Sequence, residues 1–229
     1  PKSGFNACSM FFLPKDGTFL PAHMRPIAAS NAANRIIANV VRKKIEPAIH
    51  GILERSQAGF VSFNTIEDNI FFFNDEFYSA LYTRYSPGYP GPGKEYPYKK
   101  GTKTAFWSSA DDDSPPPVAG RKDFHTLFLD FRKAFDSVSR SYLIALLRHI
   151  GIPEGYIRLT WALFSHCTAV PALGSKHDVV LDMLDGLKQG CPLSPLFFIL
   201  AIDPLLYHLS LVPSTVPKCF ADDLAVGFR

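Results

Sequence analysis

The order of apolar and polar residues predicts strands at the front of the chain and helices soon after. Residues 10–30, MFFLPKDGTFLPAHMRPIAAS, are typical of two short strands that flank a turn at residues 15–17. A helix is expected next, with Ser30 or Asn31 as its cap and Pro47 at its end. Its predicted apolar stripe consists of Ile36, Ile37, Val40, Val41 and Ile45.

A second helix is predicted over residues 65–85, where Thr65 and Asp68 form a pattern that resembles a capping box. The following residues, 86–120, are rich in Pro, Gly, Lys and Tyr and have no periodicity. Such a composition buries too little apolar surface to order itself, so we interpret 86–120 as a flexible insertion. Contact between its Tyr and Lys residues and nucleic acid is the alternative interpretation.

Regular patterns return at residue 124. FHTLFLDF predicts a buried strand that Asp130 closes, and a helix with a Ser cap and a stop at Gly151 follows. Another helix begins near Pro153, and the patterns then predict a hairpin, a long apolar helix over 196–210 and a final tight hairpin. Strands and helices alternate without regular βαβ units, so the predicted class is α+β.

Composition narrows the class of protein. The 229 residues are 47% hydrophobic and 20% charged, which is typical of a globular protein. The four cysteines form no C-x-x-C pair, and isolated thiols of this kind are typical of an intracellular protein. No secretory signal is visible, and the longest apolar run, 196–202, is too short to span a bilayer. The chain opens without Met, from which we expect it to be a segment of something longer.

Charge is distributed unevenly along the chain. Residues 1–60 hold eight Lys and Arg against three acids, a net charge of +5, and the remainder carries a net −2. A basic front and an acidic back are expected where a lobe that binds a polyanion joins one that binds metal. Basic residues of the first helix are therefore candidates for nucleic-acid contact, with a solvated helix face as the alternative. They are Arg35, Arg42, Lys43 and Lys44.

Three aspartates stand next to apolar segments. Asp130 ends an apolar strand, and Asp222 and Asp223 lie at the turn of the last hairpin. If the two elements are neighbours in one sheet, three carboxylates meet at one edge and need a cation to stay ionised. Oxygen ligands without His or Cys favour Mg²⁺, with Mn²⁺ as a substitute. Three ordinary turn aspartates remain the alternative at this point.

Three segments resemble successive motifs of the palm of a reverse transcriptase, in the same order. They are FLDFRKAFDSV, GLKQGCPLSPLFFIL and FADD, and the resemblance is closest to the enzymes of non-LTR (LINE-like) retrotransposons. Residues 13–49 and 57–70 resemble the finger motifs of that family. The resemblance implies right-hand polymerase fingers over 1–85 and a palm over 121–229, with an antiparallel sheet covered by helices. Against that family we expect an incomplete palm and no thumb, so the chain resembles a domain truncated after FADD.

The function implied by the resemblance is RNA-directed DNA synthesis with two Mg²⁺ ions. The implied partners are an RNA template, a DNA primer or target DNA, and dNTPs, within a longer polyprotein that acts in the nucleus. Asp130 and Asp222 match the metal-binding acids, the backbone carbonyl of Phe131 completes the metal shell, and Asp223 matches the third acid. Phe135 matches the aromatic residue that excludes a 2′-hydroxyl.

Further residues match positions that hold the incoming nucleotide or the template. Lys15 and Arg25 match the basic finger residues for the triphosphate, and Gln189 and Gly190 match the pair that approaches nucleotide and template. Asp136 is interpreted as a helix cap. The remaining candidates are Arg132, Lys133 and Ala134 for the nucleotide, and Arg35, Arg42, Lys43 and Lys188 for nucleic acid.

Departures from the family keep a second interpretation open. Phe63-Asn64 stands where the family usually has Gly-Arg, the insertion at 86–120 is longer than usual, and the thumb is expected to be missing. A non-catalytic relic, or a fold adopted by the host to bind nucleic acid or partners, is therefore the alternative function. A palm-fold polymerase that makes RNA is disfavoured by Phe135.

Overall fold

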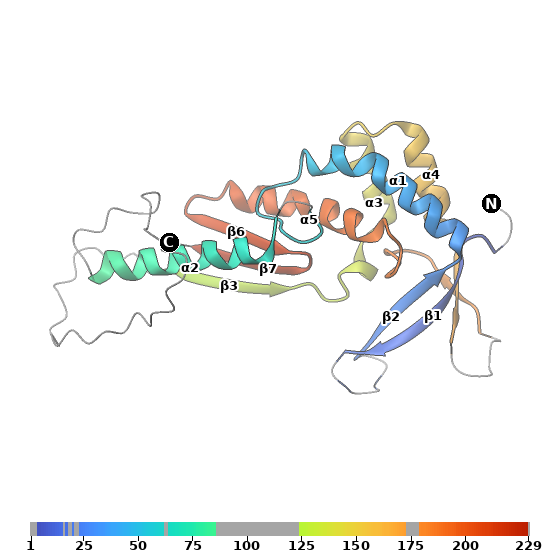
Figure 1. Cartoon of the computed structure of the whole chain (residues 1–229), viewed down its shortest axis with the longest axis horizontal. Helices are drawn as coiled ribbons and strands as arrows, with labels where there is room; N and C mark the ends of the chain where they lie inside the picture. Colours follow the sequence, from blue (N-terminus) through green and yellow to red (C-terminus); the bar gives the residue numbers. More distant parts are fainter. Residues whose placement is uncertain are drawn as a thin grey trace, which may run out of the picture.

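The computed structural model describes residues 4–15, 17, 20, 23–61, 64–85, 124–172 and 179–228. The strands form two sheets, and the helices pack between and beside them (Figure 1). The predicted α+β class is confirmed. The insertion expected at 86–120 lies outside the described residues. In the described part, none of the helices has the length and apolarity needed to cross a membrane.

The three-stranded sheet has the order β3-β7-β6 and is antiparallel throughout. It consists of β3 (His125–Asp130), β6 (Thr215–Phe220) and β7 (Asp223–Phe228). The predicted final hairpin is therefore confirmed as β6 and β7. Leu224 and Val226 point from β7 into the main core, where α5 (Ser194–Ser210) contributes the largest share of buried side chains.

The four-stranded sheet has the order β2-β1-β4-β5. β1 (Ala7–Pro14) and β2 (Met24–Ser30) form the antiparallel pair expected at the front of the chain. β4 (Cys167–Pro171) and β5 (Leu181–Met183) are the predicted middle hairpin, and β4 joins β1 in parallel. The β1–β2 hairpin extends away from the helices, so its far end is open to solvent (Figure 1).

Helices α1 (Ala32–His50), α3 (Arg140–His149) and α4 (Glu154–Phe164) pack with α5 around one apolar core. Ser139 Oγ caps α3 and Gly151 follows it with φ +78°, as the sequence predicts. Asp136 is not a helix cap, because it lies in the short 3₁₀ turn η2 (Phe135–Ser137) and Ser139 takes the cap position.

Helix α1 differs from its prediction in two ways. Asn31 is the cap, but the helix continues through Pro47 to His50, since Ile49 beyond the proline is fully buried in the core. The buried stripe is also rotated, which leaves Ile36 and Val40 exposed. The buried residues of α1 are Asn34, Ala38, Val41, Ile45 and Ile49.

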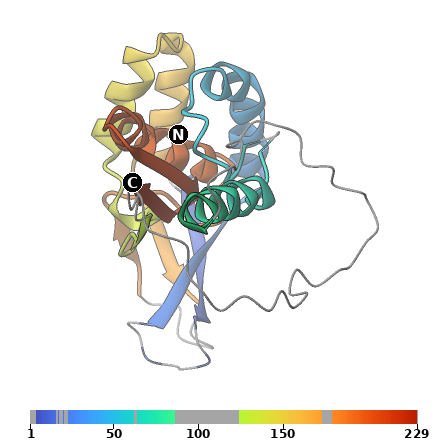
Figure 2. The ribbon, with the colours of Figure 1, turned by 90° about the vertical axis from the view of Figure 1, so that its left-hand side faces the viewer.

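Helix α2 (Ile66–Tyr85) runs beside the three-stranded sheet, next to β6 (Figure 2). Its predicted capping box is confirmed, because Thr65 N–H donates to Asp68 Oδ2 and Asp68 N–H donates to Thr65 Oγ1. Lys218 of β6 places its Nζ 4.1 Å from the centre of the Phe72 ring of α2.

Strand β3 is not buried as the sequence predicts. All six of its residues are exposed, and Phe128 is 78% exposed. The apolar run is misleading because no residue of β3 belongs to either apolar core of the described part of the chain. Its side chains project from the two faces of the sheet, and they keep contact with water on both.

Candidate active site

Two of the three predicted acids lie side by side in the three-stranded sheet. Asp130, the last residue of β3, is the register partner of Asp223, the first residue of β7. Residues directly opposite each other in an antiparallel pair project to the same face. Asp222 is the adjoining residue in the two-residue turn between β6 and β7, and Phe131 directly follows Asp130. The sheet thus brings the three acids to one edge.

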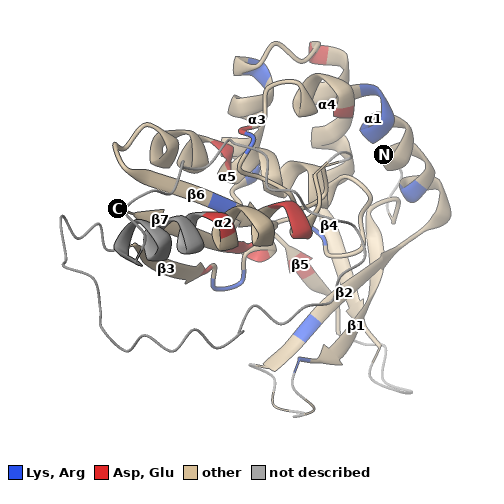
Figure 3. Ribbon diagram, turned by 60° about the vertical axis from the view of Figure 1, so that its left-hand side comes forward, with Lys and Arg blue, Asp and Glu red and all other residues tan. Residues whose placement is uncertain are grey.

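An open groove of about 590 Å³ leads away from these acids between α2 and the sheet. Asp130 and Asp223 line it together with Phe128, Ala225 and other mostly apolar side chains. In Figure 3 the acidic segments near the end of β3 contrast with the Lys and Arg segments on α1 and β2.

The loop before α5 docks on the turn that follows β3. Leu187 N–H donates to Phe135 O at 2.8 Å, and Gly186 adopts φ +81°. A Cβ on Gly186 would lie only 2.7 Å from Asp136 O, so a larger residue would push the two segments apart. These contacts hold the loop that carries Gln189 and Gly190 against the turn that carries Phe135.

Gln189 and Gly190 are joined to the β1–β2 hairpin. Ala28 N–H of β2 donates to Gln189 O at 2.7 Å. Gly190 has φ +108°, and a Cβ there would lie 2.7 Å from Ala28 O. The hairpin that carries Arg25 is therefore tied to the loop that carries Gln189.

Phe135 is half-buried rather than enclosed. Its ring stacks on Phe198 of α5, with 4.8 Å between ring centres and 15° between ring planes. Burial raises the pKa of the neighbouring Asp136, whereas Lys133 and a hydrogen bond with the Gln189 side chain lower it. Phe135 is thus held on one face, and the strand end with Asp130 is five residues away in the chain.

The prediction that Lys188 binds nucleic acid is wrong, because Lys188 is buried. Its side chain is 0% exposed, and Nζ donates to Leu163 O at 3.0 Å and lies 5.3 Å from the centre of the Phe164 ring. A buried ammonium at the C-terminal end of α4 is favourably placed, because the last carbonyls of a helix lack intrahelical partners. Lys188 therefore cannot contact nucleic acid directly.

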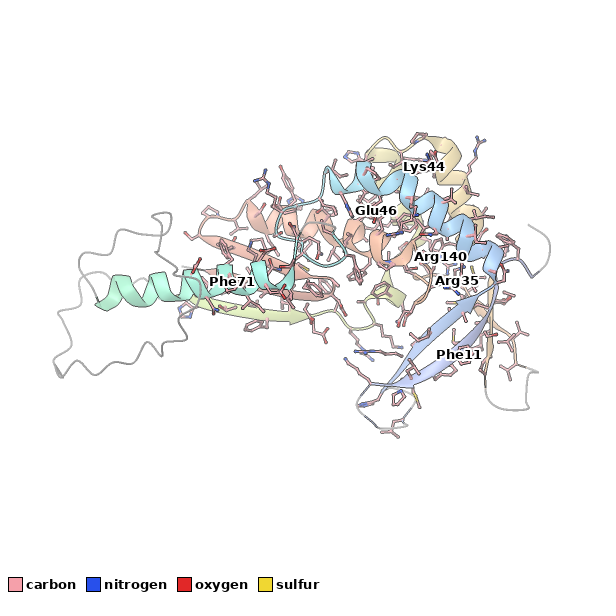
Figure 4. The ribbon with its side chains drawn as sticks, viewed as in Figure 1. Phe11, Arg35, Lys44, Glu46, Phe71 and Arg140 are labelled. Carbon is pink, nitrogen blue, oxygen red and sulfur yellow. The ribbon has the colours of Figure 1, made fainter. Side chains whose placement is uncertain are left out.

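Arg140 was not singled out from the sequence, yet it organises the same loop. The side chain is 6% exposed in total and lies where the helices meet the four-stranded sheet (Figure 4). Its guanidinium donates only to backbone carbonyls, which belong to Phe164, Met183, Leu184, Asp185 and Gly186. The one available signal was an arginine in the first turn of a helix, where the macrodipole disfavours a cation.

The other basic candidates lie at the surface. Lys15 and Arg25 are exposed on the β1–β2 hairpin, and Arg132 and Lys133 are exposed after β3, where Lys133 has φ +52°. On α1, Arg35 and Lys43 are exposed, whereas Arg42 donates to Glu46 at 3.0 Å, which partly satisfies its charge. Ala134 is half-buried beside Phe135.

The acids meet the chemical requirement of a hard cation but do not form a closed cage. Among the residues that the structure describes, no three His, Cys, Asp or Glu side chains are grouped closely enough to hold a metal ion. Asp130 and Asp223 are carboxylates that face each other in register, and a cation between them relieves their repulsion. The donor set therefore fits Mg²⁺ or Mn²⁺.

Comparison with known proteins identifies the family. The model of the family described as "Reverse transcriptase (RNA-dependent DNA polymerase)" matches residues 13–229. The chain belongs to this family. Its motifs and its relatives among retrotransposon proteins agree with a reverse transcriptase domain of the non-LTR, LINE-like kind.

Two curated relatives illustrate the relationship. The Pol polyprotein of the type-1 retrotransposable element R2 of Popillia japonica is 28% identical over 93% of this chain. The transposon TX1 149 kDa protein of Xenopus laevis is 24% identical over 85% of it. The chain spans 26% of the length of the first relative and 12% of the second.

Solved structures share the fold of this reverse transcriptase domain. Apo telomerase from Candida tropicalis, truncated from its C-terminal domain, gives a TM-score of 0.59 at 14% identity, covering 98% of this chain and 44% of that one. Telomerase from the same organism in complex with a TWJ fragment of telomeric RNA gives 0.56 at 13% identity, over 99% and 36%. At this identity the likeness establishes the fold alone, and it agrees with the predicted fingers and palm.

Proposed function

We propose that this domain carries out RNA-directed DNA synthesis, in which dNTPs are added to a primer 3′-OH on an RNA template. The observation that carries the proposal is the register of Asp130 with Asp223, which brings carboxylates from motifs about ninety residues apart to one sheet edge. Membership of the reverse transcriptase family supports the same reaction.

The acids would hold two Mg²⁺ ions, with Asp130, Asp222 and the Phe131 carbonyl as ligands and Asp223 beside them. Ions bound there would lower the pKa of an attacking hydroxyl and stabilise the leaving oxygen of a phosphoryl transfer. Asp130 and Asp223 lie on paired strands, which would hold their carboxylates in fixed positions beside the primer end.

The surrounding residues bind and select the nucleotide. Arg25 and Lys15 lie exposed on the β1–β2 hairpin and bind the triphosphate, Arg25 through its planar fork. Ala28 of β2 donates to the Gln189 carbonyl and so holds Gln189 and Gly190 in place. Gly190 has no side chain, so the backbone there approaches the nucleotide closely. Phe135, braced by Phe198, lies under the sugar and excludes a 2′-hydroxyl.

The partners of the proposed reaction are an RNA template, a DNA primer or target DNA, and dNTPs. Exposed cations of α1, Arg35 and Lys43 among them, would contact the phosphate backbone. The test is extension of a labelled DNA primer on an RNA template by the protein at its natural full length, in Mg²⁺. Binding of primer–template without extension in Mg²⁺ or Mn²⁺ would instead support the relic or host-adopted nucleic-acid-binding function.

A further inference from the structure

The turn that carries Asp222 has a strained backbone. Only Ala221 and Asp222 connect β6 to β7, and Ala221 has φ +56°. A left-handed conformation suits glycine, and it is strained for a residue that carries a side chain. Such a conformation persists only where surrounding contacts impose it.

Gln57 supplies one of these contacts from a segment 164 residues away. Its side chain is 0% exposed, and Oε1 accepts from Ala221 N–H at 3.1 Å and from Gly59 N–H at 2.7 Å. In the described part of the chain Gln57 Nε2 has no hydrogen-bond partner. The residue therefore acts on the turn as an acceptor, while its side chain also lowers the pKa of the Cys219 thiol.

The backbone around Gln57 is docked on the end of β6. Cys219 N–H donates to Ser56 O and Ala58 N–H donates to Cys219 O, each at 2.8 Å, which makes a parallel bridge. Asn69 Nδ2 of α2 donates to the same Cys219 carbonyl at 3.0 Å. The acceptor of Gln57 is thus held rigidly beside the turn.

Gly59 allows this close approach. A Cβ on Gly59 would overlap the backbone nitrogen of Ala221, and its contact with Ala221 Cα would be 2.9 Å. Only glycine leaves room for the Ala221 N–H to reach Oε1 of Gln57. The QAGF segment is therefore shaped to the FADD turn at atomic contact.

We propose that Gln57 is a positioning residue that holds Ala221 in its left-handed conformation and thereby places Asp222 for metal binding and nucleotidyl transfer. The proposal rests on the function proposed above. Without the acceptor, the buried Ala221 N–H loses its partner and the strained turn relaxes. Asp223 is less affected, because β7 pairing with β3 and β6 holds it independently.

The test compares Gln57→Met, which removes the acceptor at similar volume, with Gln57→Glu, which keeps an acceptor oxygen. Thr160→Val is the matched control, because Thr160 is buried in α4 and its Oγ1 has no partner among the described residues. Primer extension by the full-length protein gives kcat, the KM for dNTP and the Mg²⁺ concentration at half-maximal rate. Thermal unfolding gives the structural effect of each change.

Gln57→Met is expected to lower kcat about tenfold or more and to raise the Mg²⁺ requirement, since small misplacements at an active site have effects of this size. The KM for dNTP should change no more than in Thr160→Val, and Gln57→Glu should recover part of kcat. The Tm of Gln57→Met should fall, because Ala221 N–H and Gly59 N–H lose their acceptor, so the positioning role is read from kcat and the Mg²⁺ requirement. Ala221→Gly added to Gln57→Met should also recover part of it, because glycine adopts φ +56° without strain. If Gln57→Met does not fold, this double variant and Gln57→Glu provide the comparison.

Equal kcat and equal Mg²⁺ requirement in Gln57→Met and Thr160→Val would overturn the positioning role. An inactive wild-type protein would instead refute the proposed function. In that case Mn²⁺ binding tests the positioning role, measured by the loss of the EPR signal of free Mn²⁺ as protein is added. Weaker binding by Gln57→Met than by wild type supports positioning of Asp222, and equal binding overturns it.

Discussion

Asp130 of β3 and Asp223 of β7 face each other as direct register partners, although the motifs that carry them are far apart in the sequence. Like charges directly opposite in an antiparallel pair are destabilising, by about 0.2–1 kcal/mol. In the absence of divalent metal, Asp223→Asn is therefore expected to raise the free energy of unfolding by this amount. In saturating Mg²⁺ this advantage should shrink or reverse, since ions held by Asp130 and Asp222 are also attracted by the Asp223 carboxylate beside them, which wild type retains. Urea unfolding with EDTA and with Mg²⁺ measures both, and an equal advantage in both solutions would contradict a cation beside Asp223.

Phe135 is expected to act as the filter against ribonucleotides. Phe135→Ala removes the ring that stacks on Phe198 and opens space under the sugar. The ratio of kcat/KM for dNTP to that for rNTP should fall by about tenfold or more, mainly through faster use of rNTP. Single-nucleotide incorporation with each substrate measures the ratio. An unchanged ratio with a lower Tm would assign Phe135 to core packing.

Arg140 should matter more for stability than any surface arginine of the described part. Its guanidinium donates to five backbone carbonyls, and Arg140→Met leaves them without this donor. The expected loss is about 3 kcal/mol or more in the free energy of unfolding, because each orphaned buried acceptor carries a penalty. Arg148→Met, in an exposed pair with Glu154, is the control and should cost far less, because solvent screens the pair. Comparable losses for the two variants would argue against the network.

Lys188 and Lys43 should respond differently to salt. Lys43 is exposed on α1, so Lys43→Ala should reduce the slope of log K against log salt for RNA binding by about 1. Lys188→Met should lower stability, through loss of the donor to Leu163 O, and leave the slope unchanged. Fluorescence anisotropy with labelled RNA at several salt concentrations checks both, and a lower slope for Lys188→Met would refute its burial.

Cys219 gives a prediction for alkaline pH. Burial is the main cause that raises its pKa from 9.0 to about 12, the Gln57 side chain lowers it, and Asp222 and Asp223 raise it. The folded state therefore keeps the proton that the unfolded state releases, so this stability is complete below about pH 9 and is lost as the pH rises toward about 12. Between about pH 8 and about pH 10.5 wild type should lose up to about 2 kcal/mol more than Cys219→Ala in urea unfolding. A parallel loss in both proteins would contradict the assignment.

Local patterns predicted the hairpins and caps because their causes are local. The turn between β1 and β2, the capping box of Thr65 and the β6–β7 hairpin depend on neighbours a few residues away. The resemblance to the palm motifs likewise located the acids at one sheet edge.

The predictions that were wrong concern residues whose environment is set by contacts distant in the sequence. The apolar run of β3 predicts burial, but no core of the described part covers its faces, so Phe128 is exposed. Its charge predicts that Lys188 lies at the surface, but the carbonyl of Leu163 and the ring of Phe164 stabilise its ammonium in the core. The support of Ala221 by Gln57 spans 164 residues and has no local signal.

The most direct test of the proposed polymerase is the rate of a single dNTP addition to a primed RNA template in Mg²⁺, with full-length wild type and Asp222→Asn. Asp182→Asn, an exposed change on β5 of the other sheet, is the control. The proposal predicts addition by wild type and by the control, and a rate at least about 1,000-fold lower for Asp222→Asn. Addition by Asp222→Asn at the wild-type rate, or none by wild type while it still binds the template, would contradict it.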